Sequence, residues 1–208
     1  MAQKLLPSAV EDDEAAVALL VLHKLYDEEM AGKVVEAWRT LATEHDYRGP
    51  ILWQVPAGFT LKHHAAKAGP CYVDFLYLQD WNFEDTPTSE CLVFCVLRLL
   101  NGSTSKTADE QLAHLESERT RRELPEHHLT SFGSSAMVAA LILAHFKRAG
   151  ERTPLDHDWV RTDTRDNDED RLRLGYFVGL GLNCSYDWGG GGGDDLGGFP
   201  LGVETLGS

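Results

Sequence analysis

The sequence predicts an α+β fold, in which a mostly antiparallel sheet packs on a central helix of small residues after an N-terminal helical region. Three patterns support this prediction: helical periodicity over residues 12–46, later runs of branched and aromatic residues, and a slim apolar segment with helix caps at both ends. Of the 208 residues, 43% are hydrophobic and 25% are charged, as in ordinary globular proteins. We therefore expect one domain over residues 1–208, with residues 1–10 and 189–198 flexible.

The N-terminal region predicts helix because its apolar residues recur every three or four positions. These residues are Val17, Leu20, Val21, Val34, Ala37, Trp38 and Leu41. Gly32 either divides the region into two helices or is tolerated inside one. The Gly-Pro pair at 49–50 ends the helical pattern, and the apolar residues 51–55 then predict a buried strand.

The middle of the chain predicts two strands and a helix. Residues 71–81 are rich in aromatic and branched side chains, which favours a strand. The continuous apolar run at 90–102 fits a strand or a buried helix, and the Asn101-Gly102 turn signal favours the strand. Thr107 and Glu110 have the spacing of a capping box, which predicts that a helix begins there.

The central helix is the clearest element in the sequence. Ser131 or Ser134 can cap its start, small and apolar residues fill positions 136–146, and Gly150 follows two cations at its end. Its small residues are Ala136, Ala139, Ala140 and Ala144. Because they make the helix slim, we expect another element to pack closely against it.

The last part of the chain predicts further strands. Residues 158–162 and the strictly alternating residues 172–182 each read as a strand, with an acid-rich segment between them. The glycine-rich tail reads as a loop followed by a short strand at 199–203.

The net charge of −14 narrows the possible partners. Phosphate groups and anionic membranes are repelled by such a field, so direct nucleic-acid or membrane binding is disfavoured and a basic protein partner is favoured. The N-terminus lacks the pattern of an export signal, and four unevenly spaced cysteines suggest reduced thiols. A cytoplasmic location is the simplest interpretation.

The acid-rich segment 163–171, DTRDNDEDR, has the most unusual local composition. A calcium loop beginning at Asp166 would need glycine and glutamate where the chain has Arg171 and Phe177, so the pattern fails. A hairpin turn explains the segment best, and the tip of that hairpin could also bind a basic partner. The residues predicted to bind the partner are Asp163, Asp166, Asp168, Glu169 and Asp170, with Trp159 and Trp188 as aromatic anchors.

Two histidine pairs, His63-His64 and His127-His128, lack the i,i+2 or i,i+4 spacing of metal ligands. Neighbouring side chains in a strand or helix point apart, so no metal site and no cofactor are predicted. One histidine of each pair could still meet Asp74 or Asp80 in space. Cys91 and Cys95 lie in an apolar run, where core packing is the simpler explanation.

Two further motifs fail when they are compared with catalytic patterns. Gly133, Ser135 and Met137 would form a nucleophile elbow only if the last of them were glycine. The five glycines at 189–193 lack the Lys-Ser/Thr pair of a phosphate-binding loop.

The leading hypothesis is a non-enzymatic acidic binding or regulatory protein that engages a basic partner. One form of it is an inhibitor that masks a nucleic-acid-binding surface, in the manner of phage-borne or immunity-type proteins. One alternative is a small metal-assisted hydrolase built from scattered His, Asp and Ser residues, because catalytic groups need no local motif. Another is a structural subunit whose apolar helical region at 15–41 forms an oligomer interface.

Overall fold

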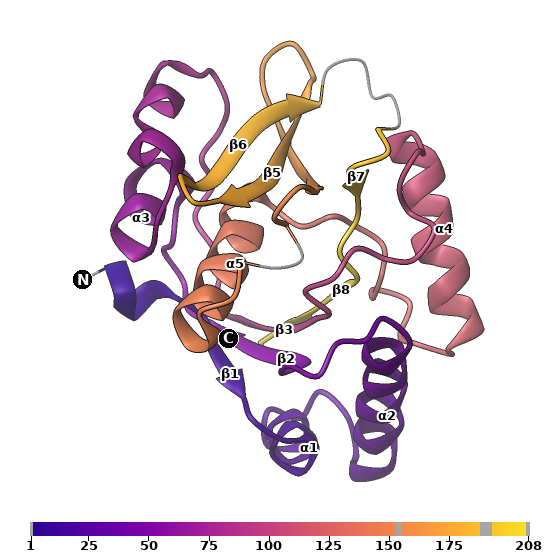
Figure 1. The fold of residues 1–208 in the computed structure, drawn as a ribbon. Helices are drawn as coiled ribbons and strands as arrows, with labels where there is room; N and C mark the ends of the chain where they lie inside the picture. The colour runs from indigo at the N-terminus through magenta and orange to yellow at the C-terminus, as the bar shows by residue number, and fades with distance from the viewer. Residues whose placement is uncertain (1, 153–154, 188–192, 207–208) are drawn as a thin grey trace.

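The structure is a computed structural model that describes residues 2–152, 155–187 and 193–206. Two four-stranded sheets and five α-helices form it, and Figure 1 shows the helix α5 lying between the two sheets. One continuous cluster of buried side chains draws on both sheets and on the helices. The predicted α+β class is confirmed.

The first sheet contains strands from both ends of the chain. It is formed by β1 (Ser8–Val10), β2 (Leu52–Val55), β3 (Cys91–Cys95) and β8 (Leu201–Thr205), in that order. All three pairings are antiparallel. The strands predicted at 51–55 and within 90–102 are confirmed, and all five side chains of β3 are buried. The strand predicted at 199–203 is present two residues later, as β8.

The second sheet contains the predicted hairpin. Its strands are β6 (Gly181–Asp187), β5 (Arg171–Val178), β4 (Trp159–Arg165) and β7 (Leu196–Gly197), in that order. The acid-rich segment turns the chain from β4 into the antiparallel β5. The single strand predicted over 172–182 is wrong in its second half, because the chain turns at residues 179–180 and returns as β6. The short β7 pairs with β4 in parallel. Of the tail segment predicted to be flexible, 189–198, residues 189–192 lie outside the described residues.

The central helix α5 (Ser135–Ala149) confirms the prediction from its small residues. Ser134 caps it by accepting a hydrogen bond from the amide of Met137, and Gly150 ends it with a left-handed φ of 71°. The helix is buried on most sides and packs on α3, β4 and β5. A Cβ at Gly69 of the neighbouring segment would lie 2.9 Å from Leu143 of α5, which shows how closely the chain approaches this helix.

The N-terminal region forms two helices, α1 (Asp13–Leu22) and α2 (Glu28–Glu44). Gly32 does not divide them, because it lies inside α2. The break occurs at residues 23–27, where Asp27 accepts from the amide of Met30 and so begins α2. The capping box of Thr107 and Glu110 begins α4 (Ala108–Arg121), as predicted.

The strand predicted at 71–81 is wrong. The segment forms the 3₁₀ helix η2 (Tyr72–Asp80), and three successive residues, Val73 to Phe75, have positive φ. Phe75 and Leu78 are its buried residues, so the inward period is three and not two. The preceding helix α3 (Leu61–Ala68) and the N-terminal 3₁₀ turn η1 (Ala2–Leu5) were not predicted. Among the described residues, no helix is long and apolar enough to cross a membrane.

Candidate functional site

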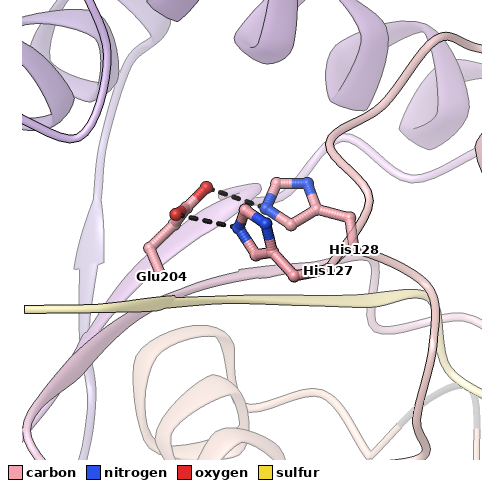
Figure 2. A group of neighbouring side chains, drawn as sticks. All are labelled: His127, His128 and Glu204. Carbon is pink, nitrogen blue, oxygen red and sulfur yellow. Dashed lines mark hydrogen bonds and ion pairs between the residues drawn. The ribbon is translucent and has the colours of Figure 1, made fainter.

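A cluster around the carboxylate of Glu204 gathers the second histidine pair at one point. Figure 2 shows both imidazole rings pointing at this carboxylate, with His127 Nε2 3.1 Å from one oxygen and His128 Nε2 2.8 Å from the other. Glu204 comes from β8, and the histidines lie in the loop after α4. His128 and Glu204 are buried, whereas about half of the His127 side chain is exposed. The site therefore has a buried part and one accessible ring.

The two histidines face the same way because they lie in a tight turn. The amide of His128 donates to the carbonyl of Pro125 over 2.9 Å, and Leu129 follows with a φ of 53°. The rule that neighbouring side chains point apart holds for strands and helices, and this segment is neither. No local sequence signal identifies Glu204 as the partner, since it lies more than seventy residues away.

Hydrogen bonds fix the protonation of the buried part. The indole N–H of Trp38 donates to His128 Nδ1, so a neutral His128 carries its proton on Nε2 and donates it to Glu204. The hydroxyl of Tyr26 also donates to Glu204, over 2.5 Å. Burial lowers the pKa of His128 below its usual value. Burial alone would raise the pKa of Glu204, but hydrogen bonds from His128 and Tyr26 outweigh it and hold that pKa below its ordinary value.

The cluster has the ligand types of a metal centre, because ligand atoms of His127, His128 and Glu204 lie within 4.8 Å of one another. The surroundings do not fit a metal ion. A histidine that binds a metal through Nε2 carries its proton on Nδ1 and donates it to an acceptor. His128 Nδ1 instead faces Trp38, which can only donate. Metal binding would therefore place two buried N–H groups against each other.

The same groups are poorly arranged for hydrolysis. The Tyr26 hydroxyl is committed to Glu204, and burial raises its pKa further, so it is a weak nucleophile. His127 could accept a proton through Nδ1. The groove between α1 and α2, described below, is lined by other residues, so His127 is not placed to act on a molecule bound there. The cluster connects three parts of the fold, namely β8, the loop before α2 and the turn after α4. Its role is therefore structural.

The other predicted histidine pair does not join this cluster. His63 is exposed on α3, and His64 Nδ1 accepts a hydrogen bond from the backbone amide of Thr60. Among the described residues, no group of three metal-binding side chains includes His63, His64, Asp74 or Asp80.

The acidic hairpin uses part of its charge to hold its own shape. Asp166 accepts from the amides of Asp168 and Asp170, which closes the turn. Asp163 accepts from the amides of Phe132 and Gly133 and pairs with Arg171, so it also serves the fold. Exposed carboxylates remain at Asp168 and at Glu169, which pairs with Arg165 of the same hairpin.

Of the two predicted aromatic anchors, Trp159 lies within the described residues and offers no open surface. Trp159 is only 8% exposed, and the guanidinium of Arg173 lies 4.6 Å from the centre of its ring. Trp188 lies outside the described residues.

An open groove with a volume of about 1030 Å³ lies between α1 and α2. Its apolar wall includes Val17, Ala18 and Val35, together with Val21 at 38% exposure and Leu22 at 73%. An exposed apolar surface of this kind is typical of an interaction site. We refer to this surface as the α1–α2 groove.

The rim of the α1–α2 groove is acidic. The carboxylates along it belong to Asp13, Glu14, Glu28, Glu36 and Glu44, and among the described residues Arg39 is the single cation that lines it. Arg39 is paired with Asp13, and Glu44 is paired with Arg121 and Arg122 of the α4 end. Glu14, Glu28 and Glu36 make no ion pair with any residue in the described part of the chain. The groove therefore combines an apolar wall with uncompensated negative charge.

Sequence reasoning found this region only as the apolar stretch of a possible oligomer interface. It missed the groove because the shape depends on the break between α1 and α2 and on the way the two helices pack. Comparison of the chain with protein-family models, curated proteins and solved structures gave no match. Function must therefore be inferred from these surfaces themselves.

Proposed function

We propose that the protein is a non-enzymatic binding protein that engages a basic protein partner through the α1–α2 groove. The observation that supports this function is an open apolar groove of about 1030 Å³ bordered by unpaired carboxylates. Exposing Leu22 and Val21 to water is unfavourable unless a partner covers them. The carboxylates on the rim add selectivity for a cationic partner and speed its association.

Charge distinguishes between the possible occupants of the groove. Two copies of the same groove would bring Glu14, Glu28 and Glu36 of one chain against those of the other, which is repulsive. A nucleic acid would be repelled by the same carboxylates. A basic protein surface is complementary to them. Where that basic surface itself binds nucleic acid, occupying it is inhibition, which is the regulatory form of this proposal.

The hydrolase alternative has less support. The histidine cluster lacks a suitable tautomer for a metal ion, and its hydroxyl group is already bonded. Its buried members form a hydrogen-bond network directed at Glu204, which joins the loop before α2, the turn after α4 and β8. Binding is therefore the function that the site favours.

The test begins with the untagged protein purified gently from its own cells and examined by native mass spectrometry. A groove variant, Leu22→Glu with Glu36→Lys, is compared with a matched control, Leu180→Glu with Glu84→Lys. Leu180 is 70% exposed at the β5–β6 turn, and the control changes the net charge by the same amount. We expect the groove variant to bind a basic partner at least about tenfold more weakly than wild type, equivalent to about 1.4 kcal/mol. The control should bind it as wild type does.

A third variant separates the groove from the acidic hairpin. It carries Asp168→Asn, Glu169→Gln and Asp170→Asn, which remove charge from the hairpin tip. Retention of the partner by this variant and its loss from the groove variant support the groove. If only the hairpin variant lost the partner, the interface would lie at the hairpin and not in the groove. A partner retained by every variant would contradict the proposed function.

A further inference from the structure

Gly32 is the fifth residue of α2 and lines the α1–α2 groove, but the fold does not explain it. A Cβ built at this position meets no atom within 4 Å, and its backbone is ordinary right-handed helix. Glycine inside a helix is less favourable than alanine because it loses more conformational freedom on folding. The position would therefore accept alanine and become more stable. What glycine adds here is an uncovered stretch of helix backbone in the wall of the groove.

Glycine permits another backbone or a bulky side chain to come close to the helix. At Gly32 the space that a Cβ would occupy is empty, and the apolar Val35 lies one turn further along the same groove. A partner that enters the groove can therefore make its closest approach here.

We infer that the partner inserts a cationic amphipathic α-helix into the α1–α2 groove, with its closest approach at Gly32. This inference rests on the proposed binding function. A groove between two helices with an apolar wall suits the apolar stripe of a third helix, which presents side chains at three- and four-residue spacing. The negative rim requires cations beside that stripe.

The spacing of the acids specifies the partner further. Glu28 and Glu36 both line the groove and lie eight residues apart on α2, which is about 12 Å along a helix axis. Cations that lie seven or eight residues apart on the partner helix match this separation. Glu14, on α1, provides a third carboxylate from the other helix of the groove. The partner segment is therefore a helix of at least two to three turns that carries lysine or arginine at this interval.

The experiment uses a synthetic helical peptide of about 18 residues as the probe. Leucines occupy one face at three- and four-residue spacing, and lysines lie eight residues apart on its flank. A second peptide of the same composition has its lysines moved to the opposite face. Affinity is measured by calorimetry, and thermal unfolding is measured on each protein variant without peptide.

Gly32→Ala is compared with Gly179→Ala as its matched control. Gly179 lies in the β5–β6 turn, outside the groove, and a Cβ there also meets nothing within 4 Å. We expect Gly32→Ala to raise the melting temperature by about 1–4 °C and to weaken peptide binding by about three- to tenfold. Gly32→Leu, which fills the space further, should weaken binding more. Gly179→Ala should leave the affinity unchanged.

The outcomes separate this inference from the function on which it rests. If Gly32→Ala stabilises the protein but binds the peptide as well as wild type, close approach at Gly32 is wrong. The groove function survives that result if Glu36→Lys and Leu22→Glu still abolish binding. If the two peptides bound with equal affinity, the proposed position of the cations on the partner helix would be wrong. If the peptide binds no variant and the protein self-associates through the groove in sedimentation, a second copy is the occupant and both proposals fail.

Discussion

The indole N–H of Trp38 donates to Nδ1 of His128 over 3.1 Å, and this bond determines which nitrogen of the imidazole carries the proton. His128 then donates through Nε2 to Glu204, which also accepts from Tyr26 and His127. Tyr26, His127 and His128 thus all donate to one ionised carboxylate, and Trp38 orients His128 for this. The group of side chains that resembles a metal centre is therefore a hydrogen-bonded carboxylate. The ionised form of Glu204 is stabilised by the groups that donate hydrogen bonds to it.

The first prediction concerns metal binding. Zinc titrated into the protein at neutral pH should show no tight stoichiometric site that depends on His128, because the tautomer required for Nε2 ligation is opposed by Trp38. Calorimetry of wild type and His128→Ala checks this, with His63→Ala as a control for exposed histidines. A one-to-one zinc complex that disappears in His128→Ala would contradict the tautomer assignment.

The second prediction concerns Glu204. Glu204→Gln replaces one carboxylate oxygen by an amide that donates, so at least one of its histidine partners faces a donor. Hydrogen bonds to charged groups contribute about 1.5–3 kcal/mol, and we expect a loss of that size in the free energy of unfolding. Urea denaturation measures it. Glu84→Gln, on the exposed surface, is the control and should behave as wild type; an equally stable Glu204→Gln would show that the network contributes little.

The third prediction concerns pH. Burial lowers the pKa of His128 and of His145, so the unfolded chain binds their protons more readily than the folded chain. Stability should therefore fall as the pH drops through and below the ordinary histidine pKa of about 6.5. The lowered pKa of Glu204 acts in the same direction at more acidic pH, below its usual value. His128→Gln should show a smaller change in unfolding free energy between about pH 7.5 and 5.5 than wild type, and an identical change would contradict the assignment.

The fourth prediction concerns a buried ion pair outside the candidate site. Arg161 is fully buried and bonds Asp187 over 2.5 Å, and its side chain also donates to the carbonyl of Lys106. Asp187→Asn removes the carboxylate charge that faces this buried guanidinium, and we expect a loss of about 3–5 kcal/mol or failure to fold. Glu29→Gln breaks the exposed pair with Lys33 and should cause no measurable change in the same denaturation assay.

The sequence predicts elements well where local chemistry determines them. The capping box at Thr107 and the left-handed Gly150 both appear as expected, because a cap depends on residues within one turn. The buried strand β3 also matches the strand favoured within 90–102, where the apolar run alone fits a strand or a buried helix. These features need no information from distant parts of the chain.

The errors arise where tertiary contacts override local patterns. Residues 71–81 have a strand-like composition but form η2, in which positive φ at Val73 leaves that side chain 55% exposed. The Glu204 cluster joins a turn to a strand more than seventy residues away, and the groove depends on helix packing. A single sequence cannot specify such pairings, because neither composition nor periodicity identifies long-range partners.

The most direct test of the groove uses a cysteine placed at its exposed wall. The native cysteines Cys71, Cys91, Cys95 and Cys184 are all buried, and burial raises their pKa values, so an engineered surface thiol is the reactive one. Leu22→Cys lies in the groove, and Leu180→Cys is its equally exposed control. Each variant is treated with the leucine-lysine peptide carrying a pyridyl disulfide, whose exchange with the protein thiolate releases pyridinethione.

The rate of mixed-disulfide formation, divided by the rate with a small pyridyl disulfide, measures how strongly each site holds the peptide. We expect a ratio at least about tenfold higher for Leu22→Cys than for Leu180→Cys, and excess unmodified peptide should abolish the difference. Equal ratios at the two sites would contradict the claim that the α1–α2 groove is the binding surface.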